Sequence, residues 1–152
     1  MRRTLIAMAA VAAAATVLAA APAAAAPAGP NSGTLTVNTI FWDDPSPVVA
    51  ATGVFEGCDA VTQQAEGARF TWGTAVFSGV KRVHCGDDHL DIAYTATLDK
   101  RLGGTHGSWR ALEGIGSFAG LSGGGRLTGT GECEAPAEDL GCILDTFTGV
   151  LA

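Results

Sequence analysis

The chain has 152 residues, which is the size of one ordinary domain. Half of its first thirty residues are alanine. These thirty contain two of the nine basic residues but none of the 15 acidic ones, so the remainder has a net charge of −8. This balance argues against nucleic-acid binding through a basic face and against attraction to an anionic membrane. All 21 glycines lie beyond residue 28, which disfavours a helix bundle because each interior glycine costs about 1 kcal/mol relative to alanine.

The first 25 residues have the three-part pattern of a secretory signal. Arg2 and Arg3 precede an uncharged apolar run from Leu5 to Ala20, and small residues follow that run. The run is shorter than the roughly 20 residues that a membrane span requires. We therefore expect residues 1–25 to be a cleaved signal peptide and residues 26–33 to be a flexible lead-in. The mature protein is then secreted and has no membrane association.

The four cysteines form an even set in a chain predicted to be exported, and this predicts two disulfides. They are Cys58, Cys85, Cys133 and Cys142. Three pairings are open, and we favour Cys58–Cys85 with Cys133–Cys142 because the polar loop between the latter two suits a bridge across a hairpin. A zinc site requires closely spaced Cys or His pairs. No two of these cysteines have that spacing, so we expect no metal.

Residues 34–152 have the composition of one β-domain. β-branched and aromatic residues recur between turn-forming segments, and no segment repeats its apolar residues at the helical period. The predicted strands are 34–42, 48–57, 70–85, 90–98, 106–112, 126–132 and 143–151, with a polar loop at 59–67. Seven or eight short strands in one domain predict an antiparallel barrel, with a β-sandwich as the second choice.

A glycine-rich segment near residue 120 carries a family resemblance. Its central part reads Gly-Ile-Gly-Ser-Phe-Ala-Gly, from Gly114 to Gly120, and a small-rich stretch ending at Leu127 follows. With the hairpin sequence before it, this segment resembles the signature of the allene oxide cyclase barrel, which dirigent proteins share. The resemblance covers about residues 85–130. It implies an all-β, closed antiparallel eight-stranded β-barrel with a central cavity.

The resemblance also allows a test for enzyme activity. Cyclases of that family bring a Glu and an Asn into the cavity from the first strand. The corresponding positions here lie near Thr39 and Phe41, and no carboxylate occurs between Thr34 and Trp42. We therefore assign no catalytic residue, expect no cofactor, and favour a protein without catalysis.

Two further clusters have simpler interpretations than a ligand site. The spacing of Gly114, Gly116 and Gly120 superficially matches a dinucleotide loop, but the sequence after it does not favour the helix that such a loop requires. The His and Asp residues at 84–89 are typical of a hairpin tip, because Asp and Gly are the residues that tight turns favour.

The aromatic residues suggest where a ligand would bind. A filled core is the simpler interpretation, and an apolar cavity with one or two polar groups is the functional one. The candidate cavity residues are Phe41, Phe70, Trp72, Tyr94 and Trp109. We predict a secreted barrel that binds a small hydrophobic molecule. The alternatives are a cyclase, isomerase or dirigent-type protein acting in the cavity, favoured by a buried carboxylate there, and an extracellular interaction module. The sequence leaves the oligomeric state open.

Overall fold

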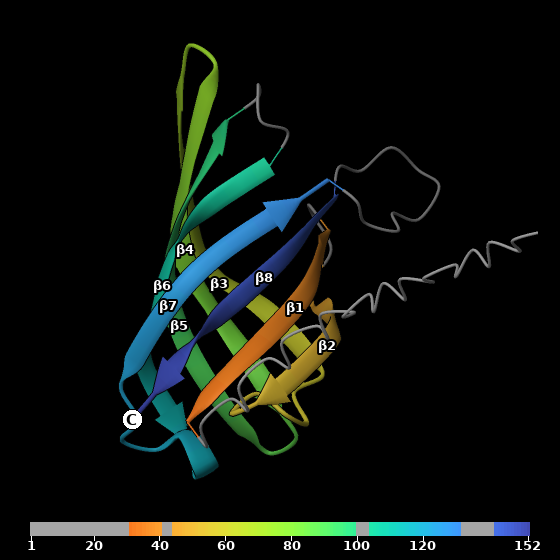
Figure 1. The fold of residues 1–152 in the computed structure, drawn as a ribbon, viewed down its shortest axis with the longest axis vertical. Coiled ribbons are helices and arrows are strands. Elements are labelled where there is room, and N and C mark those ends of the chain that lie inside the picture. Colours follow the sequence, from red (N-terminus) through yellow and green to blue (C-terminus); the bar gives the residue numbers. More distant parts are fainter. Residues whose placement is uncertain (1–30, 41–43, 100–103, 132–141) are drawn as a thin grey trace, which may run out of the picture.

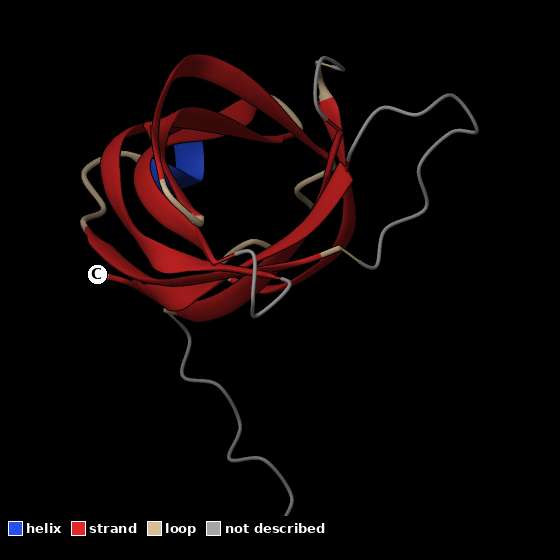
Figure 2. Cartoon of the chain, turned by 90° about the horizontal axis from the view of Figure 1, so that it is seen from above, coloured by secondary structure: helices blue, strands red, loops and turns tan. Residues whose placement is uncertain are grey.

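The structure is a computed structural model that describes residues 31–40, 44–99, 104–131 and 142–152. Eight antiparallel strands, each hydrogen-bonded to the next in the chain, close into one barrel (Figures 1 and 2). The strands are β1 (Ser32–Ile40), β2 (Ser46–Gly53), β3 (Ala60–Thr71), β4 (Thr74–Cys85), β5 (Asp88–Asp99), β6 (Gly104–Ile115), β7 (Gly123–Thr130) and β8 (Cys142–Leu151). The predicted barrel is confirmed, and the alternative sandwich is wrong.

The barrel begins slightly earlier than the sequence suggested. β1 starts at Ser32, inside the expected lead-in at 26–33, because Ser32 and Gly33 already pair with Val150 and Gly149 of β8. The expected signal peptide at 1–25 lies outside the described residues. Pairing between the first and last strands runs through nine residue pairs and closes the sheet.

The third and fourth strands correct the sequence prediction. Residues 59–67, predicted as a loop, belong mostly to β3, and the expected long strand at 70–85 is split by a turn at Trp72 and Gly73, where Gly73 has φ +81°. Residues 64–71 are exposed on both faces of β3. They therefore lack the alternation of apolar and polar residues that identifies a half-buried strand. The β3–β4 hairpin extends past the other strands at the top of Figure 1.

One end of the barrel, which we call the basal end, is filled by apolar side chains. A 3-10 turn, η1 (Gly116–Phe118), lies there together with the end of the chain (Figure 1). Phe118 and Phe55 are 3% and 1% exposed, and they pack against the interior residues of the strands. The largest of these interior residues are Leu35, Leu90, Ile92, Leu127, Phe147 and Leu151. We call the opposite end, where β1, β3, β5 and β7 finish, the apical end.

The glycines of the family-like segment build the basal corner. Gly116 has φ +62°, a conformation that glycine adopts without steric cost. Gly114 is not in that conformation; a side chain there would place its Cβ 2.6 Å from the Cβ of Phe118. Asp88 accepts a hydrogen bond from the backbone N–H of Ser117 at 2.9 Å, and this bond lowers the pKa of Asp88. The corner therefore holds Phe118 inside the barrel.

The disulfide between Cys58 and Cys85 is confirmed. It joins the β2–β3 connection to the end of β4 at the basal end. Cys142 is also disulfide-bonded, and its expected partner Cys133 lies outside the described residues. Within the described ranges, no helix has the length and apolar character needed to cross a membrane.

The Cys58–Cys85 bridge should contribute measurably to stability. It closes a loop with a sequence separation of 27 residues, and the loss of chain entropy in the unfolded state corresponds to about 3 kcal/mol. We expect the double variant Cys58→Ala/Cys85→Ala to lose roughly that free energy of unfolding in urea titrations. An equal midpoint and slope for variant and parent would contradict this expectation.

Candidate functional site

Above the apolar core, the barrel interior contains an ion pair. Lys81 on β4 and Asp145 on β8 are 4% and 8% exposed, with 3.8 Å between Lys81 Nζ and Asp145 Oδ2. Thr39 on β1 bridges them: its hydroxyl accepts a hydrogen bond from Lys81 Nζ at 3.2 Å and donates one to Asp145 Oδ2 at 2.8 Å. Three strands that are distant in sequence therefore meet in one polar cluster.

Burial shifts both charged groups toward their neutral forms. Loss of water lowers the pKa of Lys81, and the nearby carboxylates of Asp145, Glu66 and Asp44 offset that effect in part. Loss of water likewise raises the pKa of Asp145, against the opposing effects of Lys81 and the Thr39 hydrogen bond. The pair is thus easier to neutralise by proton transfer than an exposed pair would be.

Tyr94 on β5 forms the side of this cluster. Its hydroxyl donates a hydrogen bond to Glu66 Oε1 at 3.2 Å, and Lys81 Nζ lies 5.6 Å from the centre of its ring. Burial and the neighbouring negative charge of Glu66 raise the pKa of Tyr94, because both disfavour the phenolate.

Two adjoining cavities lie at this level of the barrel. The first, of about 30 Å³, is lined by Lys81, Asp145, Tyr94, Thr39 and Glu66, with Phe77, Ala96 and Leu127 among the apolar residues. That volume holds a water molecule or a small polar group. The second, of about 230 Å³, is lined almost entirely by apolar atoms, including those of Leu98. Thr105 and Ile143 line both cavities, so the polar and apolar spaces are neighbours.

Thr105 carries an unusual polar atom. The residue is 6% exposed, and its Oγ1 has no hydrogen-bond partner among the residues that the structure describes. It faces Asp145 across Gly129: a Cβ placed on Gly129 would lie 2.1 Å from Thr105 Oγ1 and 2.8 Å from Asp145 Oδ1. Glycine at 129 therefore keeps the space between these two oxygens free. An unpaired buried hydroxyl costs about 1–3 kcal/mol, so this site favours a polar ligand group.

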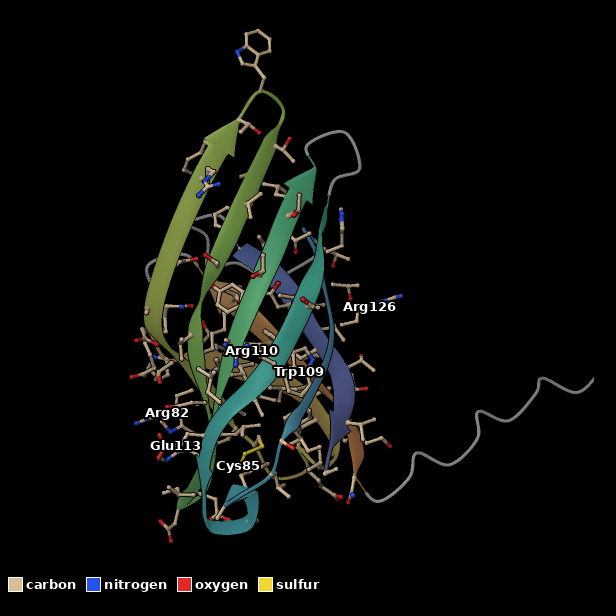
Figure 3. All side chains as sticks on the ribbon, turned by 90° about the vertical axis from the view of Figure 1, so that its left-hand side faces the viewer. Arg82, Cys85, Trp109, Arg110, Glu113 and Arg126 are labelled. Atoms are coloured by element: carbon tan, nitrogen blue, oxygen red, sulfur yellow. A yellow bond between two sulfur atoms is a disulfide. The ribbon has the colours of Figure 1, made fainter. Side chains whose placement is uncertain are left out.

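The residues that the sequence suggested for the cavity do not lie together in the structure. Tyr94 lines the polar cavity, and Phe41 lies outside the described residues. Trp109 is inside the barrel (Figure 3) but fills the core: its ring meets Phe55 edge-on at 5.8 Å, and its Nε1 donates to the carbonyl of Thr148. Phe70 and Trp72 are 72% and 106% exposed, so the prediction that they line an enclosed cavity is wrong. They lie on the part of the β3–β4 hairpin that extends beyond the barrel.

Sequence reasoning missed Lys81, Asp145 and Thr105. The first two interrupt inward-facing positions that are otherwise apolar: Lys81 alternates with buried Val83, and Asp145 with buried Phe147. A charged residue in such a position was the signal available in the sequence. Asp145 places a buried carboxylate on β8, hydrogen-bonded to Thr39 of β1.

Comparison with protein-family models, with curated proteins and with solved structures finds no match to this chain. In the described part of the chain, no group of three or more His, Cys, Asp or Glu residues has a geometry that could hold a metal ion. The site is therefore interpreted from its own residues.

Because Lys81 and Asp145 form a buried pair, we expect substitutions at these two positions to have strongly non-additive effects on the free energy of unfolding. Lys81→Met leaves Asp145 buried without its partner, and the expected loss is about 3–5 kcal/mol of unfolding free energy. Adding Asp145→Leu replaces the pair by apolar side chains and should recover most of that loss. Urea unfolding of the parent, the two single variants and the double variant gives the four free energies of unfolding that a double-mutant cycle compares. Additive losses would show that the two side chains do not interact.

The raised pKa of Tyr94 can be measured directly, since it is the sole tyrosine of the sequence. In the folded protein the phenol should remain protonated above its ordinary pKa of about 10, because burial and Glu66 oppose ionisation. Absorbance titration at 295 nm should therefore show a later transition in buffer than in guanidinium chloride. Coincident transitions, with the fold intact by circular dichroism, would contradict the described environment.

Proposed function

We propose that this protein is a secreted barrel that binds a small, largely apolar molecule carrying one polar group. The molecule lies at the apical end, with its apolar part in the larger cavity and its polar group in the smaller one. The ligand is thus the small hydrophobic molecule that the sequence suggested, with one polar group added.

The support for an apolar body comes from the larger cavity. Its volume of about 230 Å³ is bordered by Leu98, Ile143 and glycine backbone, and transfer of apolar surface from water to such a lining is favourable by about 25 cal/mol per Å². A few polar groups at one end of an apolar pocket are typical of small-molecule sites, where they set orientation.

The observation that carries the proposal is the unpaired hydroxyl of Thr105. The charged groups nearby are already engaged: Lys81 with Asp145 and Thr39, and Tyr94 with Glu66. Thr105 borders both cavities, and its Oγ1 has no hydrogen-bond partner among the described residues. A ligand hydroxyl or carbonyl in the smaller cavity would give the Thr105 hydroxyl its missing hydrogen bond.

Export is part of the proposal and rests on the amino-terminal signal pattern together with the Cys58–Cys85 disulfide. Disulfides persist in oxidising compartments and are rare in the cytosol. The closed eight-stranded antiparallel barrel is also the architecture implied by the resemblance to allene oxide cyclases and dirigent proteins.

A second candidate is an isomerase or cyclase that acts in the same cavity. It is favoured by the buried carboxylate of Asp145 beside Lys81, since catalytic acids and bases depend on pKa values shifted by burial. The two candidates differ in their products: a binding protein returns its ligand unchanged, and an enzyme converts it in a manner that Asp145→Asn abolishes.

Native mass spectrometry of protein purified from its own secretion medium tests binding in general. A co-purifying lipid-like mass is the expected result, and protein free of any bound mass would count against the proposal.

A calorimetric titration with hexan-1-ol tests the assigned position. Thr105→Val keeps the side-chain volume but removes the hydroxyl, and we expect roughly fivefold weaker binding, which corresponds to about 1 kcal/mol for one hydrogen bond. Thr128→Val is the matched control, because Thr128 lies on β7 with its side chain exposed. Equal affinities for both variants and the parent would exclude Thr105 as the polar contact.

A further inference from the structure

Lys81 is the feature of this site that ligand binding alone does not require. Its ammonium group reaches the cavity from β4 and is held by the Thr39 hydroxyl and the Asp145 carboxylate on the far side of the barrel. With 4% of its surface exposed, it differs from the solvated lysines that normally cover protein surfaces. A single amine therefore faces the small cavity at a defined position.

The surroundings of this amine favour its uncharged form. Burial lowers the pKa of Lys81, so a larger fraction is free amine at neutral pH than for an exposed lysine. Asp145, itself shifted toward the protonated form by burial, lies 3.8 Å away and can take up the released proton. Desolvated lysines are the ones that react with carbonyl compounds.

We propose that Lys81 forms an imine with the carbonyl group of a small apolar aldehyde or ketone bound in these two cavities. This inference rests on the proposed function and specifies it further, because it identifies the polar group of the ligand as a carbonyl. The carbonyl carbon occupies the small cavity beside Lys81 Nζ, and the alkyl part extends past Ile143 to Leu98.

The reaction needs no oxidant, reductant or metal. The lone pair of Lys81 Nζ attacks the carbonyl carbon, and the carbonyl π electrons move to oxygen. A proton passes from nitrogen to that oxygen and gives a carbinolamine. Loss of the hydroxyl with a second proton releases water and leaves a carbon–nitrogen double bond. One aldehyde and one amine thus yield one imine and one water molecule.

The residues around Lys81 fit this reaction. Asp145 stabilises the positive charge of the protonated imine, and Thr39 holds Asp145 Oδ2 toward the nitrogen. Thr105 Oγ1 is free to donate a hydrogen bond to the carbonyl oxygen as it gains electrons. Tyr94 remains a neutral phenol, and with Glu66 it forms the wall of the small cavity.

The composition of the chain makes the test specific. The sequence contains two lysines, Lys81 and Lys100, and Lys100 lies outside the described residues. The secreted protein is incubated with hexanal and sodium cyanoborohydride at pH 7, and hexyl groups are located by peptide mass spectrometry. We expect Lys81 to be labelled at least severalfold faster than Lys100, because burial favours its free amine and the adjoining cavities bind the aldehyde beside it. The same reaction in guanidinium chloride should remove that difference.

Hexan-1-ol separates this inference from the proposed function. It has the same chain but no carbonyl group, so it should slow labelling of Lys81 and leave Lys100 unaffected. If hexan-1-ol binds and Lys81 is not labelled ahead of Lys100, the imine is excluded and the binding proposal stands. If hexan-1-ol does not bind and the two lysines react equally, both proposals fail.

Lys81→Arg provides the matched variant. Arginine keeps the positive charge beside Asp145 but does not form a reducible imine under these conditions. We expect this variant to carry no hexyl group at position 81. The comparison of the two lysines in the parent protein decides the question even if the variant does not fold.

Discussion

The hydrogen bonding of β1 to β8 is the interaction on which the rest of the structure depends. Nine residue pairs join the first strand to the last and convert an open sheet into a barrel. The same pairing places Thr39 within hydrogen-bonding distance of Asp145, 106 residues later in the chain. Without this closure, Lys81 on β4 would have no partner across the interior. The fold and the polar cluster therefore have one common cause.

The two ends of the barrel serve different physical purposes. Phe55, Phe118 and the Cys58–Cys85 disulfide fill and fasten the basal end with apolar contacts and a covalent link. The apical half instead contains a charged pair and the Thr105 hydroxyl, which has no hydrogen-bond partner among the described residues. A buried ion pair stabilises a fold no more than well-packed apolar residues would. Stability alone therefore does not account for this cluster, and this is why we propose that it binds a polar ligand group.

The sequence predicted a strand correctly where one face of that strand is buried. It failed where both faces are exposed. β5 alternates Leu90, Ile92 and Tyr94 with polar or small residues, and its pattern identified it directly. Most of β3 is exposed on both faces, so its residues resemble a loop even though they pair along β4. The aromatic residues were equally ambiguous, because Tyr94 and Trp109 are buried neighbours on paired strands whereas Trp72, of similar chemistry, is fully exposed.

Composition, alternation and the glycine-rich corner were sufficient to predict an all-β barrel and to favour a Cys58–Cys85 bridge, because these properties depend on local chemistry and short-range geometry. The proposed binding site was decided by tertiary structure. Lys81, Asp145 and Thr105 come from three strands and meet only when the sheet closes. Which polar residue becomes buried, and which hydroxyl is left without a partner, depends on residues brought together from across the barrel, and no local pattern records it.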